Sequence, residues 1–217
     1  MGKPDQPRNP DGTWKSRGGA GVVLAGAVLA LGVNGIGGGA GVGGTATESL
    51  GAGNVSAARV TQSRQAAKQG RADAAWRGLN LRRVRRIAEP AANCALNSYG
   101  QVREFFLRNP CRSLDRTLVT LADPGGSTVV VSVSWVRMRQ RGDVGRLKRL
   151  IDVDGTGSVT QLGAQVLRQR GVRFTGTPFR SRPRGGVLVV AEGAVVSGHP
   201  DPAFFALVVD IAAELPP

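Results

Sequence analysis

The sequence is poor in the residues from which catalytic and metal sites are built. It contains one histidine, two cysteines and one tyrosine among 217 residues. The histidine, His199, stands alone in a predicted loop, which excludes a histidine-based triad and a metal site built on histidine. The run 152–157 matches the start of a calcium loop, but Gly163 replaces the bidentate glutamate, so an Asp-Gly turn is the better interpretation. We expect no catalytic activity, no metal and no cofactor.

Acidic residues are also scarce. The chain has 15 Asp and Glu against 29 Lys and Arg, which gives a formal net charge of +14 and a pI near 11.5. The excess is concentrated between Arg59 and Arg86, where nine basic residues accompany one acid, Asp73. This charge favours an anionic partner, such as nucleic acid, acidic lipid headgroups or a polyanionic envelope polymer, and does not choose among them.

A long apolar run is missing as well. Residues 18–47 contain no charged residue, and Glu48 follows them. The most apolar part of this segment, Val22–Val33, has only 12 residues. A membrane span needs about 20 residues, so the pattern fits a short span or the apolar region of a secretory signal. A G-x-G-x-x-G match within the segment lacks the strand and helix of a dinucleotide-binding unit.

The charges that flank this segment predict its orientation. Four basic residues precede it, whereas Glu48 is the one charged residue that follows closely, which predicts a cytoplasmic N-terminus. We expect a disordered cytoplasmic tail over 1–17, a transmembrane or signal-anchor segment over 18–42, and the remainder outside the cell membrane.

Residues 43–90 are predicted to form a glycine-rich linker and then a basic amphipathic helix that ends at Pro90. Leu81, Val84 and Ile87 fall on one face of this helix, and four arginines cover the rest. The helix would lie on an anionic membrane or dock its apolar side on its own domain, and periodicity leaves both readings open. The arginines expected to contact an anionic surface are Arg82, Arg83, Arg85 and Arg86.

Residues 91–217 have the pattern of an α+β domain. Ser98 and Gln101 have the spacing of a capping box, which predicts a helix over about 99–108 with Ser98 as its N-cap. Two β-branched runs around a turn at 123–126 predict a hairpin.

The second half of this domain repeats the pattern. A helix is expected over 141–151, a short helix within 159–170, a hairpin with its turn near 184–186, and a last helix from Pro202. Because hairpins are not stable alone, the two would join into a four-stranded antiparallel sheet with helices on one face.

The two cysteines, Cys94 and Cys111, flank the predicted helix over 99–108. Inside the cytoplasm they would be small buried apolar residues, whereas outside it a disulfide is favoured. A continuous helix between them would hold them too far apart, but a helix that starts after Ser98 lets the chain fold back and the disulfide close.

A basic hairpin tip is predicted in "FRSRPRGG". Its three arginines are candidates for contact with phosphate or carboxylate, although an exposed turn that carries arginines is the commoner case. These residues are Arg180, Arg182 and Arg184.

Three stretches carry a resemblance to a known group of proteins: "NCALNSYGQVREFFLRNPCRSLDRTLVTL", "TVVVSVSWVRM" and "VRFTGTPFRSR". From about Trp76 to its end, the chain resembles uncharacterised single-pass membrane proteins of high-G+C Gram-positive bacteria, a group without an assigned activity. The resemblance implies the topology of these proteins and the pairing of Cys94 with Cys111. It implies no catalytic residue.

These observations lead to two hypotheses. The first is a membrane-anchored binding or sensory domain outside the cytoplasm, without catalytic activity, whose partners are the membrane and an unknown protein or envelope ligand. Nucleic acid is not an expected partner in that compartment. The alternative is a nucleic-acid-binding protein that uses the segment 59–86 as a phosphate-contacting stripe.

Overall fold

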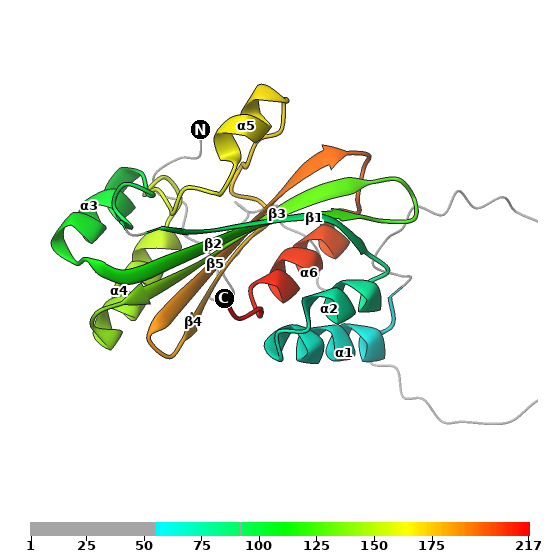
Figure 1. Cartoon of the computed structure of the whole chain (residues 1–217), viewed down its shortest axis with the longest axis horizontal. Coiled ribbons are helices and arrows are strands. Elements are labelled where there is room, and N and C mark those ends of the chain that lie inside the picture. The colour runs from blue at the N-terminus through cyan, green and yellow to red at the C-terminus, as the bar shows by residue number, and fades with distance from the viewer. Residues whose placement is uncertain (1–54, 92) are drawn as a thin grey trace, which may run out of the picture. The chain divides into compact units, whose positions relative to one another are not determined.

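The computed structural model describes residues 55–91 and 93–217, which form an α+β fold around one antiparallel sheet (Figure 1). The five strands lie in the order β1-β2-β3-β5-β4. The strands are β1 (Arg82–Ala91), β2 (Cys111–Ala122), β3 (Thr128–Met138), β4 (Phe179–Arg184) and β5 (Val187–Ser197). The helices are α1 (Ala57–Lys68), α2 (Ala72–Gly78), α3 (Gly100–Arg108), α4 (Arg141–Ile151), α5 (Ala164–Gln169) and α6 (Pro202–Ala212).

Both predicted hairpins are present. β2 pairs with β3, β4 pairs with β5, and antiparallel pairing of β3 with β5 joins the hairpins into one sheet. The helices α3, α4 and α6 lie where the sequence predicts them, and α5 is shorter than the expected segment. The α+β class is therefore confirmed.

The sheet has five strands instead of the predicted four, because the segment predicted as a basic helix is the edge strand β1. Its main chain pairs with β2 from Arg82 to Ala91, and these hydrogen bonds outweigh the helix propensity of arginine and alanine. The pairing shifts at Val84, which marks a bulge. A bulge interrupts the period-two alternation of a strand, so the apolar residues fall three apart and imitate a helical period.

The described part of the predicted linker belongs to the domain. Gly70, with a φ of +75°, separates α1 from α2, as its position in the sequence suggests. Ala67 of α1 and Trp76 of α2 are buried with Ile211 of α6 in one apolar cluster against the sheet. Residues 55–81 are thus a packed element of the fold.

Helices cover both faces of the sheet, which corrects the expectation of a single face. Helices α1, α2 and α6 pack against Val131 and Trp135 of β3, whereas α3 and α4 pack against Val136 of the same strand (Figure 1). Alternate residues of a strand point to opposite faces, so the apolar residues on both sides of β3 need two covering layers.

The predicted capping box is wrong. Tyr99 is the N-cap of α3 and makes no side-chain capping bond, and Ser98 instead forms a β-bridge with Val159. This bridge holds the start of α3 against the segment that follows α4.

The tail over 1–17, the span over 18–42 and the glycine-rich residues 43–54 lie outside the described residues. Among the residues that are described, none of the helices has the length and apolar character needed to cross a membrane.

Candidate ligand-binding cleft

A cleft of about 880 Å³ opens on the face of the sheet that carries α3 and α4. The segment between α4 and β4 forms most of its wall, and α5 projects from the fold beside it (Figure 1). Phe179 of β4 and Glu192 of β5 line the cleft from the sheet, and Tyr99 lines it from the start of α3. Three separate parts of the chain therefore build one concave surface.

Glu192 is the buried carboxylate of this cleft, with 5% of its surface exposed. Its Oε1 accepts a hydrogen bond from the main-chain N–H of Gly176 at 2.7 Å, and its Oε2 accepts one from Nε2 of Gln161 at 2.5 Å. The neighbouring Ser132 of β3 accepts a hydrogen bond from the N–H of Leu162 at 3.3 Å. These bonds fix the carboxylate and fasten the segment 158–176 to the sheet.

Two glycines bring the cleft wall close to α3. A Cβ atom on Gly157 would lie 2.1 Å from the carbonyl oxygen of Tyr99, and one on Gly100 would lie 2.6 Å from the carbonyl oxygen of Thr156. Both glycines have a positive φ, so a side chain is excluded by backbone conformation as well as by space. Any larger residue would push the two walls apart.

Ser158 adds a second polar group at the cleft. It is 6% exposed, and its Oγ has no hydrogen-bond partner among the described residues. A buried hydroxyl without a partner is destabilising, so Ser158 is a local cost to the stability of the fold beside the cleft.

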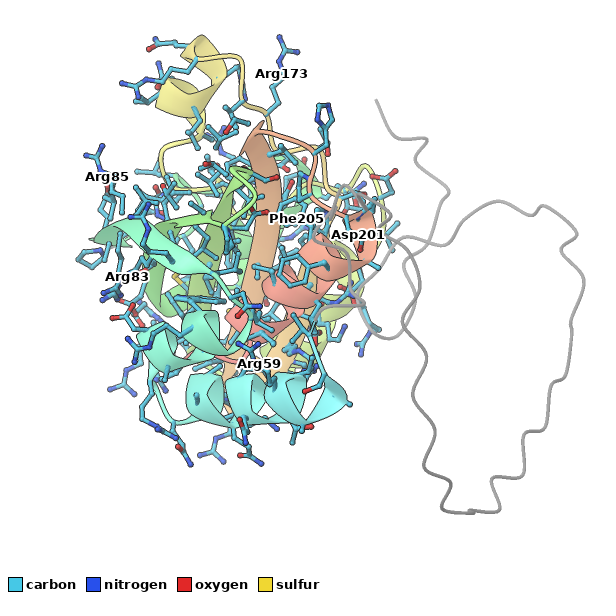
Figure 2. The ribbon with its side chains drawn as sticks, turned by 90° about the vertical axis from the view of Figure 1, so that its right-hand side faces the viewer. Arg59, Arg83, Arg85, Arg173, Asp201 and Phe205 are labelled. Carbon is cyan, nitrogen blue, oxygen red and sulfur yellow. A yellow bond between two sulfur atoms is a disulfide. The ribbon has the colours of Figure 1, made fainter. Side chains whose placement is uncertain are left out.

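The charges of the cleft differ from those of the whole chain. Asp154 and Glu192 balance Arg168 and Arg173 among the lining residues, whereas the chain carries a formal net charge of +14. Arg173 extends outward near α5 (Figure 2). The formal charges of the lining residues therefore cancel, and the cleft itself does not select for an anion.

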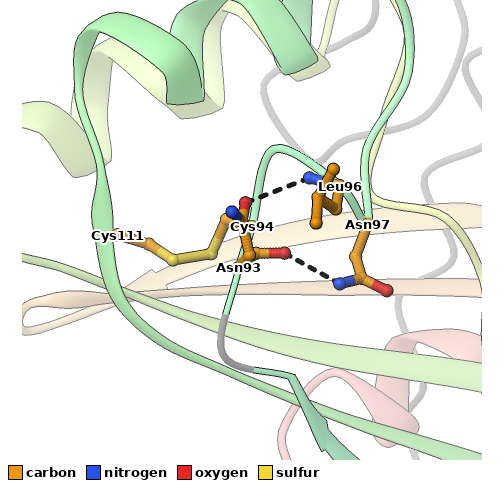
Figure 3. Close-up of a disulfide and its surroundings, with 5 residues drawn as sticks. All are labelled: Asn93, Cys94, Leu96, Asn97 and Cys111. Atoms are coloured by element: carbon orange, nitrogen blue, oxygen red, sulfur yellow. Dashed lines mark hydrogen bonds between the residues drawn. A yellow bond between two sulfur atoms is a disulfide. The ribbon is translucent and has the colours of Figure 1, made fainter.

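The disulfide between Cys94 and Cys111 is present, as the sequence predicts, with their Cα atoms 6.1 Å apart. Figure 3 shows how the chain turns back before α3: the N–H of Leu96 donates to Oδ1 of Asn93 at 3.1 Å, and Nδ2 of Asn97 donates to the carbonyl of Asn93 at 2.8 Å. The disulfide joins this turn to the first residue of β2 and so holds α3 at the cleft.

The hairpin-tip arginines predicted to contact an anionic surface pair with carboxylates of their own chain. Arg180 lies 3.2 Å from Asp210 of α6, and Arg182 also pairs with Asp210. Arg184 pairs with Glu214 at 3.1 Å. Sequence reasoning missed this arrangement, although the arginines alternate along one strand face and the two acids are four residues apart, as neighbours on a helix are.

Arg64 of α1 completes this cluster through a contact of 2.6 Å with Asp210. Burial is the largest single influence on the pKa of Asp210, and it raises that pKa. The hydrogen bonds from Arg182 and Arg64 and the charges of these arginines together outweigh burial, so the pKa of Asp210 is lowered. The pKa of Arg64 is raised because its bonds and charge interactions with Asp210 and Glu214 outweigh its burial. This cluster is an ion-pair network between α1, β4 and α6.

The four arginines predicted to lie on a helix lie along the edge strand β1 instead. Arg83 pairs with Asp73 of α2 at 2.8 Å. Within the described ranges, Arg82, Arg85 and Arg86 form no ion pair. The two sets of predicted arginines therefore differ in the structure. The arginines of β4 form ion pairs with acids of the same chain, whereas three of the four arginines of β1 form none with the described residues.

Two further features of the sequence, the partial match to a calcium loop at 152–157 and the single histidine, can also be located in the structure. Asp152, in the run that resembles a calcium loop, accepts hydrogen bonds from Lys148 and Ser181. His199 is exposed. Across residues 55–91 and 93–217, His, Cys, Asp and Glu side chains form no group of three that could hold a metal ion.

Comparisons of the chain with models of protein families, with curated proteins and with solved structures give no match.

Proposed function

We propose that this chain is a membrane-anchored binding domain outside the cytoplasm, and that its ligand occupies the cleft at Glu192. The segment 18–42 would hold it at the cell membrane with its N-terminus in the cytoplasm. No catalytic step is part of this proposal. The observation that carries it is a fixed, buried carboxylate in a cleft of about 880 Å³.

The cleft has the properties of a small-ligand site. Its volume lies within the range of about 300–1,000 Å³ that ligand pockets occupy, and its lining combines apolar side chains with a few convergent polar groups. Glu192 is held by Gln161 and Gly176 before any ligand arrives, so binding does not have to order it.

The ligand class follows from the polar groups. A carboxylate oxygen accepts hydrogen bonds, so Glu192 favours ligand groups that donate them, which are hydroxyl or ammonium groups. Charges in the lining balance, which disfavours a polyanion at this position. Phe174 and Phe179 give the ligand an apolar side to contact. We therefore expect a small hydroxylated or amine-bearing ligand.

The disulfide supports the location. Disulfides persist in oxidising compartments and are rare in the cytoplasm, where thiols are kept reduced. A disulfide-bonded Cys94 and Cys111 and a candidate membrane segment before residue 55 are consistent with a domain on the outer side of the membrane.

Alkylation of the cysteines in intact cells tests the location. Maleimide should modify Cys94 and Cys111 only after a reductant has been added. Two thiols that react without reduction would contradict the proposed compartment.

Amide NMR of the full-length chain tests the ligand site. Methyl glucoside presents hydroxyl groups and its 2-amino counterpart adds an ammonium group, so the pair covers both donor types. Shifts should concentrate on the glycines of the cleft, Gly100, Gly157 and Gly176. Glu192→Gln should abolish them, while Glu104→Gln on the exposed side of α3 should leave them unchanged. Shifts that persist in Glu192→Gln would refute the role of the carboxylate.

A further inference from the structure

The edge strand β1 is a second surface, separate from the cleft, and within residues 55–91 and 93–217 one side of its main chain is unpaired. Among the described strands β1 pairs with β2 alone, and among the described helices α2 is its main neighbour. The other edge strand, β4, is protected: it has six residues, includes Pro183, and ties its arginines to α6. Natural proteins protect sheet edges in these ways and also with charged side chains, and β1 has ten residues with a bulge, a proline near its end and four arginines. These arginines repel a basic strand, so a strand that pairs with this edge has to be acidic.

Apolar side chains are exposed along β1. Val84 is 51% exposed and Ile87 is 38% exposed, and most of the strand is open to solvent on both faces. A strand that lay beside β1 would cover these two side chains and pair the free main-chain groups.

The arginines of β1 lie on both faces of the sheet. Arg86 pairs in register with Val119, which packs on the face of α1, α2 and α6. Arg85 pairs with Thr120, whose side chain is on the opposite face. Figure 2 shows Arg83 and Arg85 extending to opposite sides of the strand. A neighbouring strand with acidic residues on both of its faces would place carboxylates beside all four arginines.

Charge rules out the two occupants that the chain itself offers. A second copy that paired β1 with β1 would bring together two strands that each carry four arginines and one acid, Glu89, and this excess of like charge is destabilising. Residues 1–54 contain three acids, Asp5, Asp11 and Glu48, against four basic residues, Lys3, Arg8, Lys15 and Arg17, so this segment carries no net negative charge. Neither occupant complements the edge.

A polyanion without a peptide backbone complements only part of the edge. Phosphates of nucleic acid would neutralise the arginines, but they carry no N–H groups for the free carbonyls of β1 and no apolar side chain for Val84 and Ile87. An acidic peptide in the extended conformation satisfies the charge, the main chain and the apolar side chains together. We propose that β1 binds an acidic, extended segment of a partner protein, which adds to the sheet as a sixth strand.

Fluorescence anisotropy with the full-length chain tests this proposal. The probe is a labelled peptide of about ten residues in which two Glu-Glu pairs separated by one valine are flanked by threonine and valine, matching the spacing of Arg82, Arg83, Arg85 and Arg86. A second probe is the same peptide with alternate amides N-methylated on the edge that would face β1. It keeps the charge and loses the donors.

The variant Arg85→Glu/Arg86→Glu reverses two charges of the edge. Its matched control, Arg141→Glu/Arg149→Glu, makes the same change in net charge on exposed positions of α4. We expect the acidic peptide to bind the unmodified chain and the control with equal affinity, and the edge variant at least about tenfold more weakly. N-methylation should weaken binding by a similar factor.

Three results would overturn the proposal. The first is an acidic peptide that does not bind at low salt, and the second is an N-methylated peptide that binds as well as its parent. The third is a single-stranded DNA of equal charge that binds more tightly, with a salt dependence of about −0.7 per phosphate contacted, since that would identify β1 as a nucleic-acid surface.

Discussion

Gly193 of β5 and Phe205 of α6 are in such close contact that a Cβ atom on the glycine would lie 2.5 Å from Cζ of the ring. Phe205 is buried, and its place on α6 against the sheet is visible in Figure 2. The missing side chain lets the helix approach the sheet directly behind Glu192, which is the preceding residue of the strand. The same contact therefore supports the core and the cleft.

Gly193→Ala should lower the free energy of unfolding by about 1–3 kcal/mol, because an added methyl group in a packed core forces its neighbours to move. Urea denaturation measures this. Gly142→Ala in α4 is the control: nothing lies within 4 Å of an added Cβ there, so the change should be neutral or slightly stabilising. Equal stability of the two variants would mean that the α6 contact is not tight.

Removal of the disulfide by Cys94→Ala/Cys111→Ala should lower the free energy of unfolding by about 3 kcal/mol, the loop-entropy estimate for a closed loop of this length. The measurement is guanidinium denaturation of the oxidised chain, the reduced chain and the double variant. The reduced chain and the variant should agree. If reduction has no effect, the disulfide does not form in the folded protein.

Asp210→Asn should lower the free energy of unfolding at neutral pH by about 2 kcal/mol, because Arg64, Arg180 and Arg182 lose a shared carboxylate in a partly buried cluster. The pKa of Asp210 is lower in the folded than in the unfolded chain, so its contribution is complete above the unfolded pKa. That contribution is lost as the pH falls through the folded pKa.

The difference between the unmodified chain and Asp210→Asn should therefore disappear in acid, which denaturation at a series of pH values will show. Asp73→Asn breaks the exposed pair with Arg83 and provides the comparison. Its cost should stay below about 1 kcal/mol at every pH. A difference for Asp210→Asn that persists in strong acid would contradict the assigned role of its charge.

The sequence was sufficient for elements whose pattern is local. Val144, Leu147 and Ile151 have a helical period and do form the buried face of α4. The sequence was misleading at β1, where the bulge at Val84 gives a strand the apolar spacing of a helix. Because β1 was predicted as a helix, the predicted sheet had four strands instead of five, and residues 55–90 were assigned to a linker instead of to the domain.

The cleft could not be predicted from local sequence patterns. Glu192, Gln161 and Gly176 come from a strand and two parts of a loop, and they meet only because β4 and β5 pair and the loop folds over them. No spacing in the sequence relates these residues. The cysteines were predictable because one short helix separates them, and its start fixes whether they can meet.

Two buried tryptophans provide a direct measure of one hydrogen bond. Nε1 of Trp135 donates to the carbonyl of Leu215 at 2.7 Å and so ties the C-terminal segment to β3, whereas Nε1 of Trp76 has no partner among the described residues. Both side chains are almost fully buried in the same apolar cluster. Substitution by phenylalanine removes a similar volume from each site.

Trp135→Phe leaves the carbonyl of Leu215 unpaired, while Trp76→Phe removes an N–H that was already unpaired. A buried polar group without a partner costs about 1–3 kcal/mol, so Trp135→Phe should be the more destabilising substitution by about that amount. Urea denaturation of both variants gives the difference directly. Equal losses would show that the bond to Leu215 does not stabilise the fold, and that volume alone sets the cost of either substitution.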